Sequence, residues 1–156
     1  MSEMIFPQAV VDTSVLVKGL VPPRREKKDG LYQSQQKIYL WCKQFLEGID
    51  SGVTRMIIPA VALVETAAVI SRLTNDPVVA REAVTYLRRV ASVVLHDTEL
   101  WFPAIEIGIQ TKSSGFDVLF LTCSKLTGAP LITDDKKLWE AAKHHGFSCF
   151  LVREMS

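Results

Sequence analysis

Residues 9–20 read AVVDTSVLVKGL, an apolar run that ends at Asp12 and passes directly into a segment beginning with two hydroxyl residues. Thr or Ser is suited to begin a helix, and a glycine near the end of the segment is suited to stop it. A short strand followed at once by a helix is therefore predicted. Residues 130–145, PLITDDKKLWEAAKHH, repeat this order and place Asp134 and Asp135 directly after a strand.

The rest of the chain continues the alternation of short apolar runs and amphipathic segments. Further strands are expected at residues 55–58, 93–95 and 148–152, and further helices at 33–48, 60–73, 76–90, about 98–109 and 115–126. We expect Asp97 or Thr98 to cap the helix that ends near residue 109. Ser114 is expected to cap the helix that follows, and Gly128 to end it.

This alternation predicts an α/β fold built from βαβ units. The expected architecture is one domain over residues 1–156, a doubly wound, mainly parallel sheet of four to five short strands flanked by helices. A chain of 156 residues with 48% hydrophobic content can build one such core. Ligands of these sheets bind beyond the carboxyl ends of the strands, where Asp12 and Asp135 project.

Four acidic residues are expected to meet at that edge: Asp12, Glu65, Asp117 and Asp135. Glu65 lies on the apolar face of its helix with no cation nearby on that helix, so it needs a distant cationic partner or a metal ion. Each of the others has a structural alternative. Asp12 can cap backbone amides, and Asp117 stands three residues after Ser114, as in a capping box.

Asp134 and Asp135 both suit a helix N-terminus, and we assign Asp134 to the cap and Asp135 to the site. The joint convergence favours metal chemistry, because four separate structural roles would not require the acids to meet. Hard cations such as Mg²⁺ and Mn²⁺ prefer oxygen ligands and can activate water for attack on a phosphodiester.

Composition narrows the classes of partner and compartment. The net charge of +1 excludes a global basic field, so a polyanion must be held locally. Three widely spaced cysteines favour free thiols and a cytoplasmic location, and we expect neither a targeting segment nor a membrane span. The loop VPPRREKKDG, residues 21–30, is either a solvated loop or a surface that tracks an RNA backbone through its cations, Arg24, Arg25, Lys27 and Lys28.

From about Ile5 to Val152 the chain resembles the PIN-domain ribonucleases, particularly the small toxins of the VapBC toxin–antitoxin type. The segments that carry the resemblance are VVDTSVLV, PAVALVETAAVISR and GFDVLFLTCSKLTGAPLITDD. The resemblance implies that Asp12, Glu65, Asp117 and Asp135 form an acidic site that binds Mg²⁺ or Mn²⁺. It also implies that Ser14 and Thr133 orient ligands or water, and its last motif, Thr, any residue, Asp, selects Asp135 over Asp134. The cationic loop is longer than in compact toxins, which leaves the subclass open.

The resemblance implies a metal-dependent endoribonuclease that acts on RNA, pairs as a homodimer and has an antitoxin protein as a partner. Two alternatives from outside the enzyme class remain. One is an inactive PIN scaffold that binds RNA or protein through the same pocket. The other is a receiver-like, phosphate-accepting domain, which would normally carry an acid pair at the first strand and a lysine after the last. This chain has VVDTS and FLVRE at those places.

Overall fold

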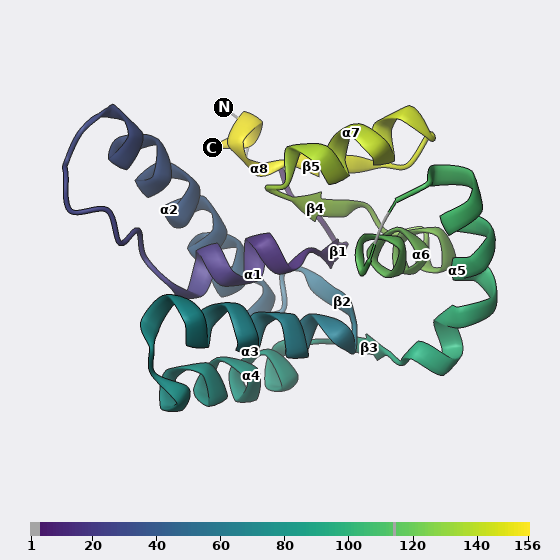
Figure 1. Cartoon of the computed structure of the whole chain (residues 1–156), viewed down its shortest axis with the longest axis horizontal. Coiled ribbons are helices and arrows are strands. Elements are labelled where there is room, and N and C mark those ends of the chain that lie inside the picture. The colour runs from purple at the N-terminus through teal and green to yellow at the C-terminus, as the bar shows by residue number, and fades with distance from the viewer. Residues whose placement is uncertain (1–3, 114) are drawn as a thin grey trace.

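The computed structural model of the chain describes residues 4–113 and 115–156. Within these residues, a five-stranded parallel sheet is flanked by helices, which confirms the predicted α/β fold (Figure 1). The strands are β1 (Gln8–Val11), β2 (Arg55–Pro59), β3 (Val93–Leu95), β4 (Leu131–Thr133) and β5 (Cys149–Leu151). The helices are α1 (Thr13–Leu20), α2 (Gly30–Asp50), α3 (Val61–Thr74), α4 (Pro77–Val90), α5 (Asp97–Thr111), α6 (Asp117–Thr127), α7 (Lys136–His144) and α8 (Val152–Met155).

The strand order β3-β2-β1-β4-β5 makes the sheet doubly wound. The chain builds outward from β1 to β2 and β3, then returns to the other side of β1 with β4 and β5. The order therefore reverses between β1 and β4, whose register pairs Val10 with Leu131 and Val11 with Ile132. One residue further, the Asp12 amide donates to the Ile132 carbonyl over 3.0 Å. The ends of these two strands consequently lie side by side, at the place where such sheets bind ligands.

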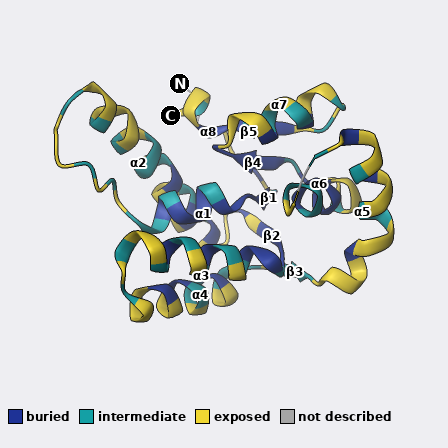
Figure 2. Ribbon diagram, in the orientation of Figure 1, coloured by how far each residue is buried: buried dark blue, intermediate teal, exposed yellow. Residues whose placement is uncertain are grey.

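The core follows from the composition of the strands. Ala9, Val10 and Val11 of β1 are fully buried, as expected for the central strand of a sheet covered on both faces. Figure 2 shows the strands mostly buried and the outer faces of the helices exposed. In residues 4–113 and 115–156, no helix is long and apolar enough to cross a membrane.

Helix α1 approaches α2 closely because Gly19 lacks a side chain. A Cβ at this position would lie 3.0 Å from the carbonyl oxygen of Cys42 in α2, which is tighter than ordinary contact. Helix α2 begins at Gly30 and not at residue 33 as predicted, because the Asp29 side chain accepts a hydrogen bond from the Tyr32 amide, 3.1 Å. The close approach at Gly19 packs α2 against α1, the helix that follows directly after β1.

Two other predicted helix starts need correction. Helix α5 begins at Asp97, and its N-cap residue is His96, whose amide donates to the Glu99 side chain over 2.7 Å. Helix α6 begins at Asp117 after Phe116, with no side-chain cap at that residue, so Asp117 lies in the first turn and not at the third position of a capping box. The proposed cap, Ser114, lies outside the described residues.

All three cysteines are free and buried: Cys42 in α2, Cys123 in α6 and Cys149 in β5. Burial among apolar neighbours raises the pKa of each thiol to about 12. As predicted, the thiols pack as small hydrophobic groups and form no disulfide framework.

Candidate active site

Asp12 occupies the end of β1 and is 6% exposed. Its Oδ2 atom accepts hydrogen bonds from Ser14 Oγ at 2.6 Å and from Thr133 Oγ1 at 2.8 Å. Burial raises the pKa of this carboxyl group, and the two hydroxyl groups oppose the rise. Asp12 is the N-cap residue of α1, but its side chain makes no capping hydrogen bond. The carboxylate therefore does not have the capping role that the sequence left open.

Glu65 faces Asp12 from helix α3. Thr13, the neighbour of Asp12, donates from Oγ1 to Glu65 Oε1 over 2.9 Å. Burial raises the pKa of Glu65, and the negative charge of Asp12 adds to the rise. Among the described residues, no cation forms an ion pair with Glu65. As predicted, the Glu65 carboxylate lies partly buried on a largely apolar helix face without a cationic partner.

Asp117 completes the set from the first turn of α6. Burial raises its pKa to about 6, and the negative charges of Asp12, Asp135 and Glu65 contribute to the rise in that order. Neighbouring negative charges raise the pKa of a carboxyl group in this way. Asp117 therefore lies within electrostatic reach of Asp12 after β1, Glu65 on α3 and Asp135 after β4.

Thr133 connects the two strand ends. Its hydroxyl donates to Asp12 and accepts a hydrogen bond from the amide of Asp135 over 3.0 Å. Asp135 itself is exposed, and one of its oxygens, Oδ1, accepts from the Leu138 amide at 3.1 Å as the N-cap of α7. Ser14 makes a parallel connection, since its hydroxyl donates to Asp12 and accepts from the Asp134 amide over 3.0 Å.

The assignment of Asp134 to the helix cap is wrong. Asp135 caps α7, whereas the Asp134 side chain is fully buried and pairs with Lys18 Nζ at 2.5 Å and Arg153 Nε at 3.2 Å. The amide of Arg153 also donates to Asp134 Oδ1 over 3.1 Å. The Asp134 side chain thus links α1 and α8 to the end of β4. These contacts indicate a structural role for Asp134.

The donor set suits a hard divalent cation. Within residues 4–113 and 115–156, the structure shows no group of three or more acidic, cysteine or histidine side chains arranged to hold a metal ion. Mg²⁺ does not need one, because it keeps several waters and is commonly held by one or two carboxylates together with substrate phosphate. The residues that could hold such an ion are Asp12, Glu65, Asp117 and Asp135, whose mutual repulsion a cation would relieve.

Two of the four cations predicted to bind RNA are engaged within their own segment. Arg25 forms a two-pronged ion pair with Asp29, at 2.9 and 2.5 Å, and holds the pKa of Asp29 down to about 2. Lys28 lies 3.8 Å from the centre of the Tyr32 ring. Lys27 is exposed, and Arg24 lines a groove that begins at Thr13 and Ser14. Arg24 is therefore the cation of this loop that lines the groove.

When the pH is lowered from 7 to about 5, the melting temperature of the metal-free wild type is expected to rise relative to that of the Asp117→Asn variant. The pKa of Asp117 is about 6 in the folded chain and 3.8 ordinarily, so the folded state binds more protons between these values. Stability from this group is therefore lost as the pH rises through that window. Circular-dichroism melts of both proteins at pH 5, 6 and 7 measure the effect. A difference between the two melting temperatures that does not change with pH would contradict it.

Comparison with known proteins identifies the family of this chain. The PIN domain family matches residues 9–144, a range that includes all four acids. Among solved structures, the chain is similar to PAE2754 from Pyrobaculum aerophilum, with a TM-score of 0.61 and 14% identity over 95% of this chain and 85% of that one. It is also similar to a domain of a functionally unknown protein from Methanocaldococcus jannaschii DSM 2661, with a TM-score of 0.49 and 19% identity over 93% and 90% of the two chains. At 14% identity, the likeness to PAE2754 is one of fold alone. None of the curated proteins compared with the chain matches it.

Proposed function

The chain belongs to the PIN domain family, a nuclease-type group, and we propose that it is a Mg²⁺- or Mn²⁺-dependent endoribonuclease that hydrolyses RNA phosphodiester bonds. The observation that carries the proposal is the buried carboxylate of Asp12, coupled electrostatically to Asp117 and Glu65, since none of these three acids forms an ion pair among the described residues. Such a cluster is costly unless a cation is bound. The PIN domain match favours this nuclease over the receiver-like alternative.

In this proposal Asp12, Glu65, Asp117 and Asp135 hold the metal, which would activate water and stabilise charge on the phosphate. The surrounding hydroxyl groups would orient these carboxylates. Ser14 and Thr133 hold one oxygen of Asp12, and Thr13 holds one oxygen of Glu65. The other oxygens, Oδ1 of Asp12 and Oε2 of Glu65, make no side-chain hydrogen bond among the described residues and can face a ligand.

RNA cleavage by the purified protein is expected to depend on added metal. Incubation with a mixed pool of single-stranded RNA should give cleavage with Mn²⁺ or Mg²⁺ and none with EDTA, because in this proposal the bound ion activates the water and stabilises the charge that develops on the phosphate. Restoring excess metal after chelation is the control for irreversible damage. Activity that survives EDTA would reject a metal-dependent mechanism, and RNA binding without cleavage of any substrate would favour the inactive scaffold.

The resemblance to VapBC toxins supports a finer proposal: residues 1–156 act as one domain, in the cytoplasm, as the toxin of a toxin–antitoxin pair. Its partner would then be an antitoxin protein, and the gene adjacent to that of the chain would encode it.

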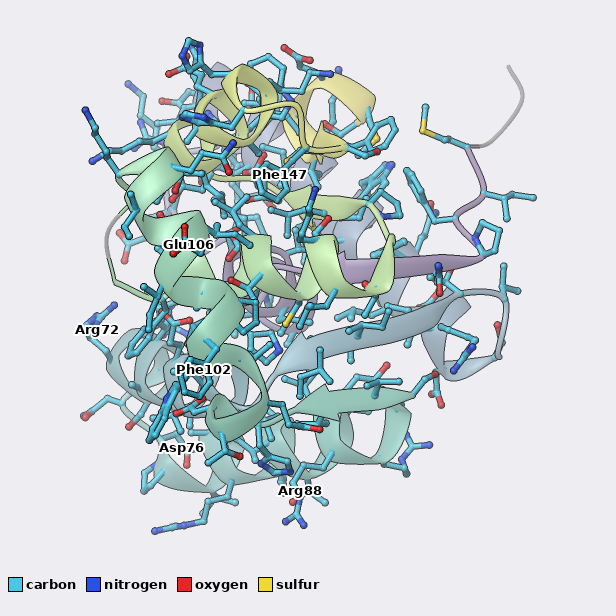
Figure 3. The ribbon with its side chains drawn as sticks, turned by 90° about the vertical axis from the view of Figure 1, so that its right-hand side faces the viewer. Arg72, Asp76, Arg88, Phe102, Glu106 and Phe147 are labelled. Atoms are coloured by element: carbon cyan, nitrogen blue, oxygen red, sulfur yellow. The ribbon has the colours of Figure 1, made fainter. Side chains whose placement is uncertain are left out.

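We further propose a homodimer that pairs through α5. This helix exposes Trp101, Phe102, Ile105 and Ile109, which are 60%, 82%, 56% and 66% exposed. Figure 3 faces this side of the molecule and labels Phe102 on the helix. Trp101 is therefore a surface residue that can take part in a subunit contact. A continuous exposed apolar face of this kind marks an interaction site.

Phe102→Glu is expected to convert the dimer to a monomer, because it places a charge in the centre of the apolar face. Light scattering at micromolar concentration measures the mass of each species. Val64→Glu is the matched control, since Val64 is also a surface hydrophobe, 68% exposed, but lies on α3. A wild-type protein that is monomeric at these concentrations, or a Phe102→Glu variant that stays dimeric, would rule out this interface.

A further inference from the structure

A groove of about 500 Å³ extends from the candidate active site between α1, α2 and α3. Figure 1 shows α1 between the other two helices, with residues 21–29 passing to one side. A volume of this size is typical of sites for small ligands. The four-acid site does not account for the groove, since none of the four acids lines it.

Two hydroxyl residues connect the groove to the acids. Thr13 and Ser14 line it, and the same side chains donate to Glu65 and Asp12 over 2.9 and 2.6 Å. A phosphodiester held at the carboxylates would therefore direct one of its neighbouring nucleotides into the groove. This continuity connects the groove to the substrate of the proposed reaction.

The lining of the groove is mostly apolar and includes a few polar side chains. Its walls are apolar, with Val17 of α1, Ile38 of α2 and Val69 of α3 among them. Two groups on α2 are suited to a nucleobase: the ring of Tyr39 offers a stacking surface, and the Gln35 amide can both donate and accept at a base edge.

Positive charge is present beside these groups. Arg24 lines the groove and is exposed, whereas Lys18, also in the lining, is already paired with Asp134 at 2.5 Å. Arg24 is thus the cation available to a phosphate. An apolar wall, an aromatic ring, a side-chain amide and a free cation together match the parts of a nucleotide better than an apolar helix, which needs a row of hydrophobic pockets.

We propose that this groove binds the base and ribose of the nucleotide adjacent to the scissile phosphate in single-stranded RNA, with the base stacked on Tyr39. The inference rests on the proposed function, because it takes the phosphodiester at the four carboxylates as its starting point. It adds a binding site for one nucleotide and a residue that recognises its base.

The test uses tetraribonucleotides that carry 2-aminopurine, whose fluorescence changes on stacking, or an abasic ribose at each position in turn. Binding is measured with Ca²⁺ in place of Mg²⁺. Tyr39→Leu, which keeps the apolar volume but removes the ring, is expected to weaken binding by about tenfold or more, the loss typical of one base stack. Tyr39→Phe keeps the ring and should bind as the wild type does.

Two further comparisons assign the loss to the base and to the phosphate. An abasic ribose at one position should weaken wild-type binding to the level of Tyr39→Leu and have no further effect in that variant. Arg24→Ala should lower the dependence of binding on salt, whereas Lys27→Ala, a change in the same loop outside the groove, should alter it less.

Equal binding by Tyr39→Leu and wild type, or no effect of an abasic ribose at any position, would overturn the proposal. So would a leucine-rich amphipathic helical peptide that binds wild type and loses binding in Tyr39→Leu while the tetranucleotide does not. Cleavage of the same tetranucleotides with Mn²⁺ separates this inference from the proposed function. Base-dependent binding without cleavage supports the groove and rejects the ribonuclease; cleavage without base-dependent binding does the reverse.

Discussion

Asp12→Asn is expected to lower metal-dependent RNA cleavage by at least ~100-fold, because it removes the most buried ligand of the proposed ion. The substitution is nearly isosteric, and the carbonyl oxygen of asparagine can accept the hydrogen bonds that Ser14 and Thr133 donate. Loss of activity would therefore reflect the missing charge rather than altered packing. Initial rates on a defined RNA with saturating Mn²⁺ measure the effect, with Asp97→Asn, the same change at an exposed position on α5, as the control.

The same variant is expected to melt at a higher temperature than wild type when metal is absent. Burial and the neighbouring carboxylates raise the pKa of Asp12 or of its partners, so a neutral amide relieves a cost in the folded state. Mn²⁺ at ten times its dissociation constant should stabilise wild type by about 1.4 kcal/mol and Asp12→Asn by less. Unchanged cleavage, or a lower metal-free melting temperature with an intact Mn²⁺ shift, would make Asp12 a structural residue and reject the site.

Asp134→Ala is expected to cost about 3 kcal/mol in the free energy of unfolding, because Lys18 and Arg153 lose a charged acceptor and the Arg153 amide loses its partner. Both cations are nearly half exposed and water can solvate them, so the cost stays below that of a fully buried pair. The melting temperature should fall by roughly 6–12 °C for a chain of this size.

Asp135→Ala is the matched comparison at the adjacent position. It removes the cap of α7, which is worth about 1 kcal/mol, and should lower the melting temperature by only a few degrees. Cleavage should be lost in Asp135→Ala and retained in Asp134→Ala below its melting temperature. If Asp134→Ala lost cleavage and Asp135→Ala retained it, Asp134 would be the residue of the active site and Asp135 only a helix cap.

Much of the fold could be predicted because its elements carry local signals. Asp76 and Pro77 mark the start of α4, Gly128 ends α6 in the left-handed conformation, and short apolar runs define the strands. The convergence of Asp12 and Asp135 follows from the rule for strand ends in parallel sheets. Helix α8 was not predicted, because four residues leave no periodic pattern.

The predictions that were wrong depended on contacts between residues far apart in the sequence. Asp134 and Asp135 look equivalent beside a helix N-terminus, and only Lys18 and Arg153, 116 and 19 residues away, distinguish them. On α5, Leu100 and Trp101 share one apolar pattern, yet Leu100 is fully buried and Trp101 is 60% exposed. Hydrophobic spacing cannot separate a side chain that meets the core from one that is left on the surface.

Chemical labelling of the three buried thiols can measure local opening of the folded chain. A thiol that has a pKa of about 12 and is at most 3% exposed reacts with an alkylating reagent mainly when the surrounding segment opens, so its labelling rate measures how often that happens. Cys42 reports on α2 beside the groove, Cys123 on α6 behind Asp117, and Cys149 on β5 at the edge of the sheet. Mass spectrometry of the labelled peptides therefore reads three separate regions of the native chain at once, with no engineered probe.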